Sequence, residues 1–107
     1  MGIFDFLRGP NIEEGLKQFK ESDKGLLIDV RDKASYKAGH IPGAKNLPLD
    51  QLSKLDKLTT SKDQPLFFYC TAGNMSRMAT AQAQSMGYTQ AHNIGGITSY
   101  KGPIERA

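Results

Sequence analysis

The chain is poor in side chains that form disulfides or bind metals. It has one cysteine, Cys70, and two histidines, His40 and His92. One cysteine cannot form an internal disulfide, and these side chains together fall short of the four ligands that a structural zinc site usually needs. We therefore expect no metal site. Because a lone thiol persists where disulfides do not form, we also expect a cytoplasmic location.

Long hydrophobic runs and a strong excess of one charge are also missing. The opening stretch MGIFDFLRGP has too short an apolar segment, interrupted by Asp5, for a signal peptide or a membrane span. The formal net charge is +3, but the 14 Lys and Arg residues are interleaved with 11 Asp and Glu residues instead of forming a basic stripe. The sequence therefore predicts neither membrane association nor nucleic-acid binding.

The length of 107 residues fits one domain, to which we assign residues 11–107, with residues 1–10 as an N-terminal lead-in. With 38% hydrophobic and 23% charged residues, the composition is that of a globular chain, which excludes a largely disordered protein. The sequence leaves the oligomeric state open.

Capping residues and apolar spacing predict the helices. Asn11 is a suitable N-cap for a first helix that ends near residues 20–24, and Asp32 for a short helix over residues 33–38. A further helix begins at Asp50 and bears Leu52, Leu55 and Leu58. In the last helix, from Met75 onward, we expect one face to be buried in the core. That face holds Met75, Met78, Ala79, Ala83 and Met86.

Apolar runs between these helices predict strands. LLIDV at residues 26–30 is typical of a strand covered on both faces, and PLFFYC at residues 65–70 gives the strongest signal, which favours the centre of the sheet. Residues 44–49 form a brief strand that Pro48 limits to a strand end or an edge, and HNIGG at residues 92–96 forms the last. Strands separated by helices indicate an α/β fold: a central parallel sheet of about four to five strands with helices on both faces.

Cys70 ends the central strand and is followed by TAGNMS, residues 71–76. In a strand, turn and helix of this kind, successive backbone N–H groups converge and attract an anion. Gly73 and Asn74 suit the turn because both accept left-handed backbone angles. Such a setting lowers the pKa of a thiol, so we expect Cys70 to present an accessible, reactive sulfur at the rim of the sheet. The alternative is a buried cysteine that packs as a small apolar side chain.

Three motifs, in this order along the chain, resemble those of the rhodanese family of sulfurtransferases. They are LIDVR at residues 27–31, GHIPGA at residues 39–44 and CTAGN at residues 70–74. GGITSY, at residues 95–100, resembles the closing Gly-Gly motif of the family, with Tyr100 where an aromatic residue, usually Trp, is found. The resemblance covers essentially the whole assigned domain and implies a rhodanese-like fold.

The resemblance also implies a reaction. The Cys70 thiolate would take a sulfane sulfur from thiosulfate or a persulfide, hold it as a persulfide, and pass it to a nucleophilic acceptor. The donor would be a small molecule or a protein and the acceptor a thiol or cyanide, with no cofactor or metal. Backbone amides of the loop would bind the sulfur anion. The substrate-binding residues implied by the resemblance are Thr71, Ala72, Gly73, Asn74, Met75, Ser76 and Arg77.

The chain departs from the family pattern at two points. Met75 stands where the family often has Arg or a small hydroxyl residue, and the sequence leaves open whether Arg77 compensates for it. A glutamate that commonly supports the arginine of the first motif is missing, which leaves Asp29 or Asp32 as the partner of Arg31.

Two other classes use a loop of this type. Phosphatases and arsenate reductases need an arginine after five intervening residues, where this chain has Ser76, and Arg77 comes one residue too late. A non-catalytic rhodanese-like module that binds a partner, or senses redox or persulfide state, stays open because a low-pKa thiol forms mixed disulfides.

His40 belongs to a turn in the family pattern, so we expect it to form hydrogen bonds there instead of acting as a base.

Overall fold

The computed structural model describes residues 9–107, so most of the N-terminal lead-in lies outside the described residues. Within them the strands form one parallel sheet in the order β2-β1-β3-β4. The strands are β1 (Leu26–Asp29), β2 (Lys45–Asn46), β3 (Leu66–Cys70) and β4 (Ala91–Gly96). The α/β prediction is confirmed, including the central place of the strand that ends in Cys70 and the edge place of the brief strand.

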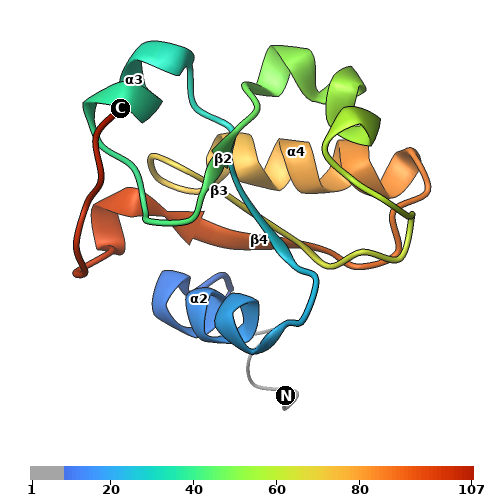
Figure 1. Cartoon of the computed structure of the whole chain (residues 1–107), viewed down its shortest axis with the longest axis horizontal. Helices are drawn as coiled ribbons and strands as arrows, with labels where there is room; N and C mark the ends of the chain where they lie inside the picture. The colour runs from blue at the N-terminus through green and yellow to red at the C-terminus, as the bar shows by residue number, and fades with distance from the viewer. Residues whose placement is uncertain (1–8) are drawn as a thin grey trace.

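Helices cover both faces of the sheet, as expected. The helical elements are α2 (Ile12–Glu21), α3 (Lys33–Ala38), α4 (Asn74–Ser85) and the 3-10 helices η1 (Leu49–Lys57) and η2 (Ile97–Ser99). Figure 1 shows α2 below the sheet, with α4 and η1 on its other side. No helix within residues 9–107 is long and apolar enough to cross a membrane.

The strands form the core because alternate side chains point to opposite faces of a sheet. Leu27 and Phe67 pack with the residues of α2, while Ile28 and Phe68 pack on the side of α4 and η1. Cys70 packs in the same group of buried side chains as Ile28 and Phe68. The thiol therefore points to the side of the sheet from which α4 begins.

The predicted N-caps are confirmed. The side chain of Asn11 accepts a hydrogen bond from the Glu14 N–H at 3.1 Å, and the side chain of Asp32 accepts one from the Ser35 N–H at 2.8 Å. Each cap satisfies an amide that has no partner within its own helix.

The segment after Pro48 is a 3-10 helix, and it begins one residue earlier than predicted. Leu52 and Leu55 are fully buried, and Leu58 is partly buried. Leucines at every third position form one continuous stripe on a helix with three residues per turn, so the 3-10 form buries this spacing well.

The prediction that the methionines of α4 lie in the core is wrong for two of them. Met75 is 38% exposed and Met78 is 55% exposed, while Ala79 and Ala83 are fully buried. Small residues face the sheet because α4 packs closely against β3, β4 and η1, which leaves no space for longer side chains on that face. Met86 packs partly against the core, as expected.

Candidate active site

The sulfur of Cys70 lies where the loop after β3 turns into α4. The Gly73 N–H donates to Sγ at 3.1 Å and the Ser76 N–H donates to it at 3.3 Å. The Ser76 hydroxyl oxygen is also 3.3 Å from Sγ. The donors converge because the chain bends sharply between the end of β3 and the first turn of α4.

Gly73 makes that bend possible. It is the N-cap of α4 with a left-handed φ of +104°, which a residue with a side chain adopts only with strain. Its carbonyl oxygen accepts the Arg77 N–H at 3.1 Å, which fixes the first turn of the helix. Across the loop, a Cβ at Gly96 would collide with the backbone of Thr71 and Ala72, so a glycine at this position lets β4 approach the loop.

The environment of the thiol favours its ionised form. Burial raises the pKa of Cys70, but hydrogen bonds from the Ser76 hydroxyl and from the backbone N–H groups of Ser76, Gly73 and Met75 outweigh burial. The net effect is a pKa below the ordinary value of a cysteine. The thiolate is the nucleophilic form, so these donors increase the fraction of reactive sulfur at neutral pH.

The expectation of an accessible sulfur is corrected by the structure. Cys70 is only 2% exposed, because the loop that aims its amides at the sulfur also encloses it. The cysteine is thus buried, as in the alternative interpretation, yet its polar surroundings differ from those of an apolar core site. It is a buried thiol surrounded by backbone N–H groups and the Ser76 hydroxyl.

The loop residues implied by the family resemblance fall into two groups. Gly73 and Ser76 contact Sγ directly, and Ser76 is fully buried. The Thr71 carbonyl accepts from the N–H and the hydroxyl of Thr98, at 3.2 and 3.1 Å, which ties the loop to η2. The exposed residues of the loop and first helical turn are Thr71, Ala72, Asn74, Met75 and Arg77.

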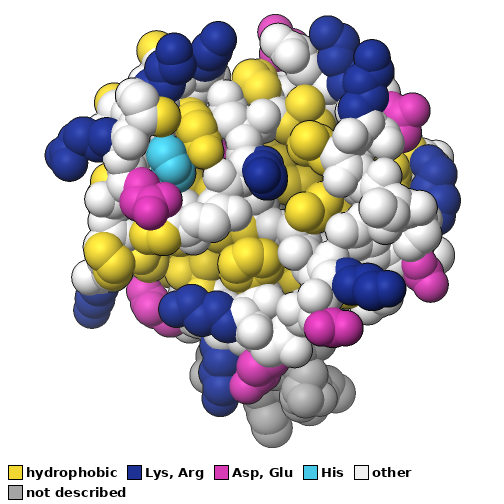
Figure 2. Space-filling view, viewed as in Figure 1, with side chains coloured by type: hydrophobic (Ala, Val, Ile, Leu, Met, Phe, Trp, Pro, Cys, Tyr) yellow, Lys and Arg dark blue, Asp and Glu magenta, His cyan; other side chains and the backbone are white. Residues whose placement is uncertain are grey.

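Arg77 does not meet the sulfur. With Ala72 and Asn74 it lines a groove of about 650 Å³ that also borders the start of α2 and includes Lys101. Cys70 is not part of that lining. Among the described residues, no Lys or Arg side chain hydrogen-bonds to Sγ. Figure 2 shows basic and acidic side chains scattered over the face in view, in agreement with the dispersed charge of the sequence.

An ion pair holds the neighbouring strand end. Arg31 donates to the fully buried carboxylate of Asp29 at 2.7 to 3.1 Å and to the Gly39 carbonyl at 2.6 Å. Asp29, not Asp32, is therefore the partner of Arg31, which answers the question left open by the sequence. Through Gly39, the pair fastens the GHIPGA turn to the end of β1.

His40 has a structural environment, as expected. Its Nδ1 is 2.8 Å from the Tyr36 carbonyl, and its ring stacks on that of Tyr36 at a centroid distance of 3.8 Å. Its Nε2 lies 3.9 Å from the exposed carboxylate of Glu105. These contacts tie α3 to the C-terminal segment.

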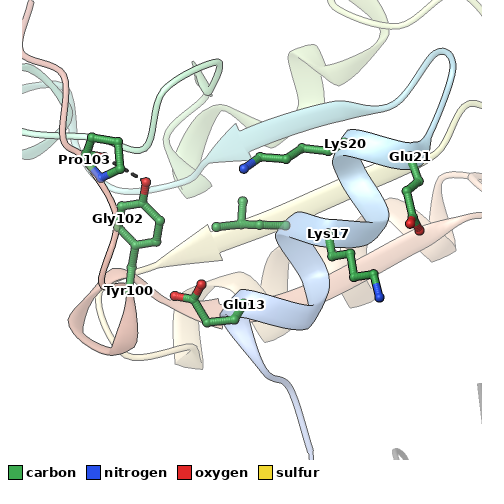
Figure 3. A pocket seen from close by; sticks show the side chains of 8 residues that line it. Glu13, Lys17, Lys20, Glu21, Tyr100, Gly102 and Pro103 are labelled. Carbon is green, nitrogen blue, oxygen red and sulfur yellow. Dashed lines mark hydrogen bonds between the residues drawn. The ribbon is translucent and has the colours of Figure 1, made fainter.

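Tyr100, at the aromatic position of the closing motif, lines a second groove of about 420 Å³ between α2 and the C-terminal segment. Figure 3 shows its ring facing Glu13 across that groove, with Lys20 further along. The Tyr100 hydroxyl donates to the Pro103 carbonyl at 2.8 Å. Neither Cys70 nor any other loop residue lines this groove, so it is separate from the sulfur site.

Sequence reasoning missed one residue next to the site, Asn93 in β4. Its side chain accepts a hydrogen bond from the Ser76 hydroxyl at 2.7 Å. The only local signal was an amide side chain in a short strand, where Asn is disfavoured. That signal does not say which segment the side chain meets.

Comparison with known proteins agrees with this geometry. Residues 13–102 match the rhodanese-like domain family. The chain is 32% identical over 94 residues to the human thiosulfate:glutathione sulfurtransferase, covering 76% of this chain and 82% of that protein. It is 37% identical over 83 residues to the uncharacterized protein YqhL of Bacillus subtilis, covering 77% of this chain and 65% of YqhL.

Some relatives are much longer. The adenylyltransferase and sulfurtransferase uba4 of Ogataea parapolymorpha is 35% identical over 91 residues, which are 84% of this chain but 23% of that protein. Among solved structures, a rhodanese from E. coli superposes with a TM-score of 0.72 at 31% identity, covering 78% of this chain and 99% of that one. The motifs, the parallel sheet and these matches agree that the chain belongs to the rhodanese-like domain family, whose members include sulfurtransferases.

Proposed function

We propose that the protein is a sulfurtransferase in which Cys70 carries a sulfane sulfur as a persulfide. The observation that carries this proposal is the convergence of the Gly73 and Ser76 N–H groups on Sγ, at 3.1 and 3.3 Å. Peptide N–H groups stabilise a sulfur anion without reorganising, and they do so for the thiolate and for a persulfide alike. Similarity to the human sulfurtransferase supports the same chemistry.

The reaction has two displacements. The Cys70 thiolate attacks the outer sulfur of the donor, a new S–S bond forms, and the donor's own S–S bond breaks. Sulfite leaves if the donor is thiosulfate, and a thiolate leaves if it is a persulfide. An acceptor thiolate or cyanide then attacks the outer sulfur of the Cys70 persulfide, which yields a new persulfide or thiocyanate and restores the Cys70 thiolate. The oxidation level of the protein is unchanged over the cycle, so no cofactor is needed.

The loop supplies the binding site in this proposal. Because Cys70 is only 2% exposed, the donor has to present a single sulfur atom to it through the loop. The exposed side chains of Thr71, Ala72, Asn74 and Met75 would contact the rest of a small-molecule or protein donor. Arg77 would act at the edge of this site. A thiol that must stay reduced also supports a cytoplasmic location.

The mass of the intact protein tests the first displacement. The reduced protein is incubated with thiosulfate or with glutathione persulfide and desalted. Its intact mass is then measured, and peptide mapping locates any added sulfur. We expect a gain of one sulfur on the peptide that contains Cys70. The single cysteine makes the assignment unambiguous. Cys70→Ser should gain none, and an equal gain in that variant would contradict the proposal.

Turnover separates the enzyme from a sensing module that uses the same thiol. Thiocyanate release with cyanide, and persulfide formation with glutathione, are followed at catalytic protein concentration. We expect many turnovers per protein and none above background with Cys70→Ser. A single loading event without turnover would favour the redox or persulfide sensor.

The phosphatase alternative has no support at the sulfur. Those enzymes hold a tetrahedral oxyanion with an arginine fork, whereas Arg77 lines the groove beside α2. We expect only background hydrolysis of an aryl phosphate. A rate that disappears in Cys70→Ser would reverse this ranking.

A further inference from the structure

Asn93 lies at an irregularity in the sheet. The pairing between β3 and β4 runs from Phe68 opposite Asn93 to Tyr69 opposite Gly95, so Ile94 is an extra residue on β4. The Gly95 N–H donates to Asn93 Oδ1 at 3.0 Å, and Gly95 has a left-handed φ of +108°. A bulge of this kind redirects the side chains around it. Here it turns the Asn93 amide toward the loop that follows Cys70.

The amide meets the two residues whose N–H groups reach the sulfur. Asn93 Oδ1 accepts the Ser76 hydroxyl at 2.7 Å, and Asn93 Nδ2 donates to the Gly73 carbonyl at 3.3 Å. The orientation of the amide is fixed chemically, because a backbone N–H needs the oxygen and a backbone carbonyl needs the nitrogen. Asn93 itself does not touch Cys70. It contacts Ser76 and Gly73, the residues that donate to the sulfur, through the Ser76 hydroxyl and the Gly73 carbonyl.

The Ser76 hydroxyl has one hydrogen and four acceptors within reach. These are Asn93 Oδ1 at 2.7 Å, the Gly73 carbonyl at 3.1 Å, and the Gly95 carbonyl and Cys70 Sγ at 3.3 Å each. With a neutral thiol, the S–H can donate to the Ser76 oxygen while the hydroxyl donates to Asn93. With a thiolate, the hydroxyl can turn to the sulfur, and Asn93 Oδ1 keeps its bond to the Gly95 N–H.

We propose that Asn93 is a positioning residue for Cys70. The Asn93 side chain holds Gly73 and Ser76 so that their N–H and hydroxyl donors meet the sulfur. It accepts the Ser76 hydrogen while the thiol is neutral and releases it when the thiolate forms, without becoming unpaired. The thiol proton leaves to solvent or to the departing group of the donor. Without Asn93, Gly73 and Ser76 lose a shared anchor on β4, and the thiolate loses part of its stabilisation.

Alkylation of Cys70 tests this role directly. The rate of reaction with iodoacetamide is measured against pH, and the single cysteine means that only one site reports. We expect the midpoint of the profile to rise by about one pH unit in Asn93→Ala, which is about a tenfold loss of thiolate at pH values below it.

Asn46→Ala is the matched control. Asn46 is also half-buried, and its Nδ2 donates to the carbonyls of Asp29 and Arg31 at 3.0 and 2.9 Å. Asn46→Ala therefore also loses two side-chain hydrogen bonds at the carboxyl edge of the sheet, but on β2, two strands away from the strand that carries Cys70. Asn46→Ala should lower the melting temperature but keep the wild-type midpoint. If Asn93→Ala also keeps that midpoint, the role of Asn93 is structural only and the proposal is wrong.

A second variant keeps the test decisive if Asn93→Ala does not fold. Asn93→Asp retains the shape and the acceptor for Gly95, but it cannot donate to the Gly73 carbonyl and adds negative charge near the sulfur. We expect a rise in the midpoint larger than that of Asn11→Asp, an exposed N-cap where Asp serves equally well. An unchanged midpoint, or an equal rise in both variants, would overturn the proposal.

The inference gains its significance from the proposed function, but its test does not depend on sulfur transfer. A wild-type protein that shows the expected alkylation profiles and no sulfur loading would contradict the sulfurtransferase and leave the role of Asn93 intact. A wild-type protein that loads sulfur, together with an Asn93→Ala variant that keeps the wild-type alkylation midpoint, would support the sulfurtransferase and contradict the role of Asn93.

Discussion

The carboxyl ends of β1 and β3 are neighbours in the sheet, yet they use polar groups in opposite ways. At the end of β1, Asp29 and Arg31 neutralise each other, and Arg31 also satisfies the Gly39 carbonyl. At the end of β3, the hydrogen-bond partners of Cys70 are backbone N–H groups and one hydroxyl, and none of these groups carries a charge. Charges paired inside the protein are unavailable to a ligand. Donors aimed at an atom that gains negative charge stabilise that charge. We therefore propose that the end of β1 (the β1 corner) is structural and that the end of β3 (the β3 corner) is reactive.

The largest effect is expected from breaking the β1 corner. Asp29→Ala leaves Arg31 partly buried without a counter-charge, since its side chain is only 11% exposed. We expect the free energy of unfolding to fall by about 3 to 5 kcal/mol, measured by urea denaturation.

Asp32→Ala is the control for this change. Asp32 is exposed and caps α3, so its loss should lower the free energy of unfolding much less than the loss of Asp29. Equal losses in the two variants would mean that the ion pair does not hold the corner.

The next effect is expected at the β3 corner and falls on reactivity. Ser76→Ala removes the hydroxyl 3.3 Å from Sγ but keeps the backbone N–H. The pKa of Cys70 should rise by about one unit, and the thiolate fraction at neutral pH should fall about tenfold. Stability should change by only about 1 kcal/mol. A variant that loses several kcal/mol but titrates normally would make Ser76 a structural residue like Asp29.

Much of the fold could be predicted because its signals are local. The β-favouring run that ends at Cys70 identified the central strand, and the side chains of Asn11 and Asp32 marked the helix starts that the structure has. The turn after Cys70 was readable from Gly73, since a left-handed residue at a strand end favours glycine.

What could not be predicted depends on contacts between distant segments. The exposure of Met75 and Met78 depends on how closely α4 approaches the sheet, which the apolar spacing of one helix does not reveal. The contact between Asn93 and Ser76 joins residues 17 positions apart through a bulge. Burial of the sulfur likewise results from closure of the loop, not from any single residue.

Stability should depend on pH through the thiol. The pKa of Cys70 is lowered in the folded protein relative to its ordinary value of 9.0. The thiolate therefore adds stability that is fully present above about pH 9 and is lost as the pH falls through the folded pKa. In urea denaturation under reducing conditions, the stability difference between wild type and Cys70→Ser should rise with pH across this window and then level off. A difference that falls with rising pH would show that burial outweighs the hydrogen bonds.

The smallest effect concerns charge at the rim of the β3 corner. Met75 is apolar and 38% exposed, and Arg77 lines the groove beside the loop without a hydrogen bond to the sulfur, so we expect a dianionic donor to meet no cation directly at the sulfur. Met75→Arg should raise kcat/KM for thiosulfate by about two- to fivefold, the range of an exposed charge interaction, and the gain should shrink with added salt. Met78→Arg adds the same charge one turn further from the loop and should give less. If kcat/KM rises equally in both variants, the added charge acts through the overall electrostatic attraction of the protein for anions. The apolar side chain at residue 75 would then not determine which donor is preferred.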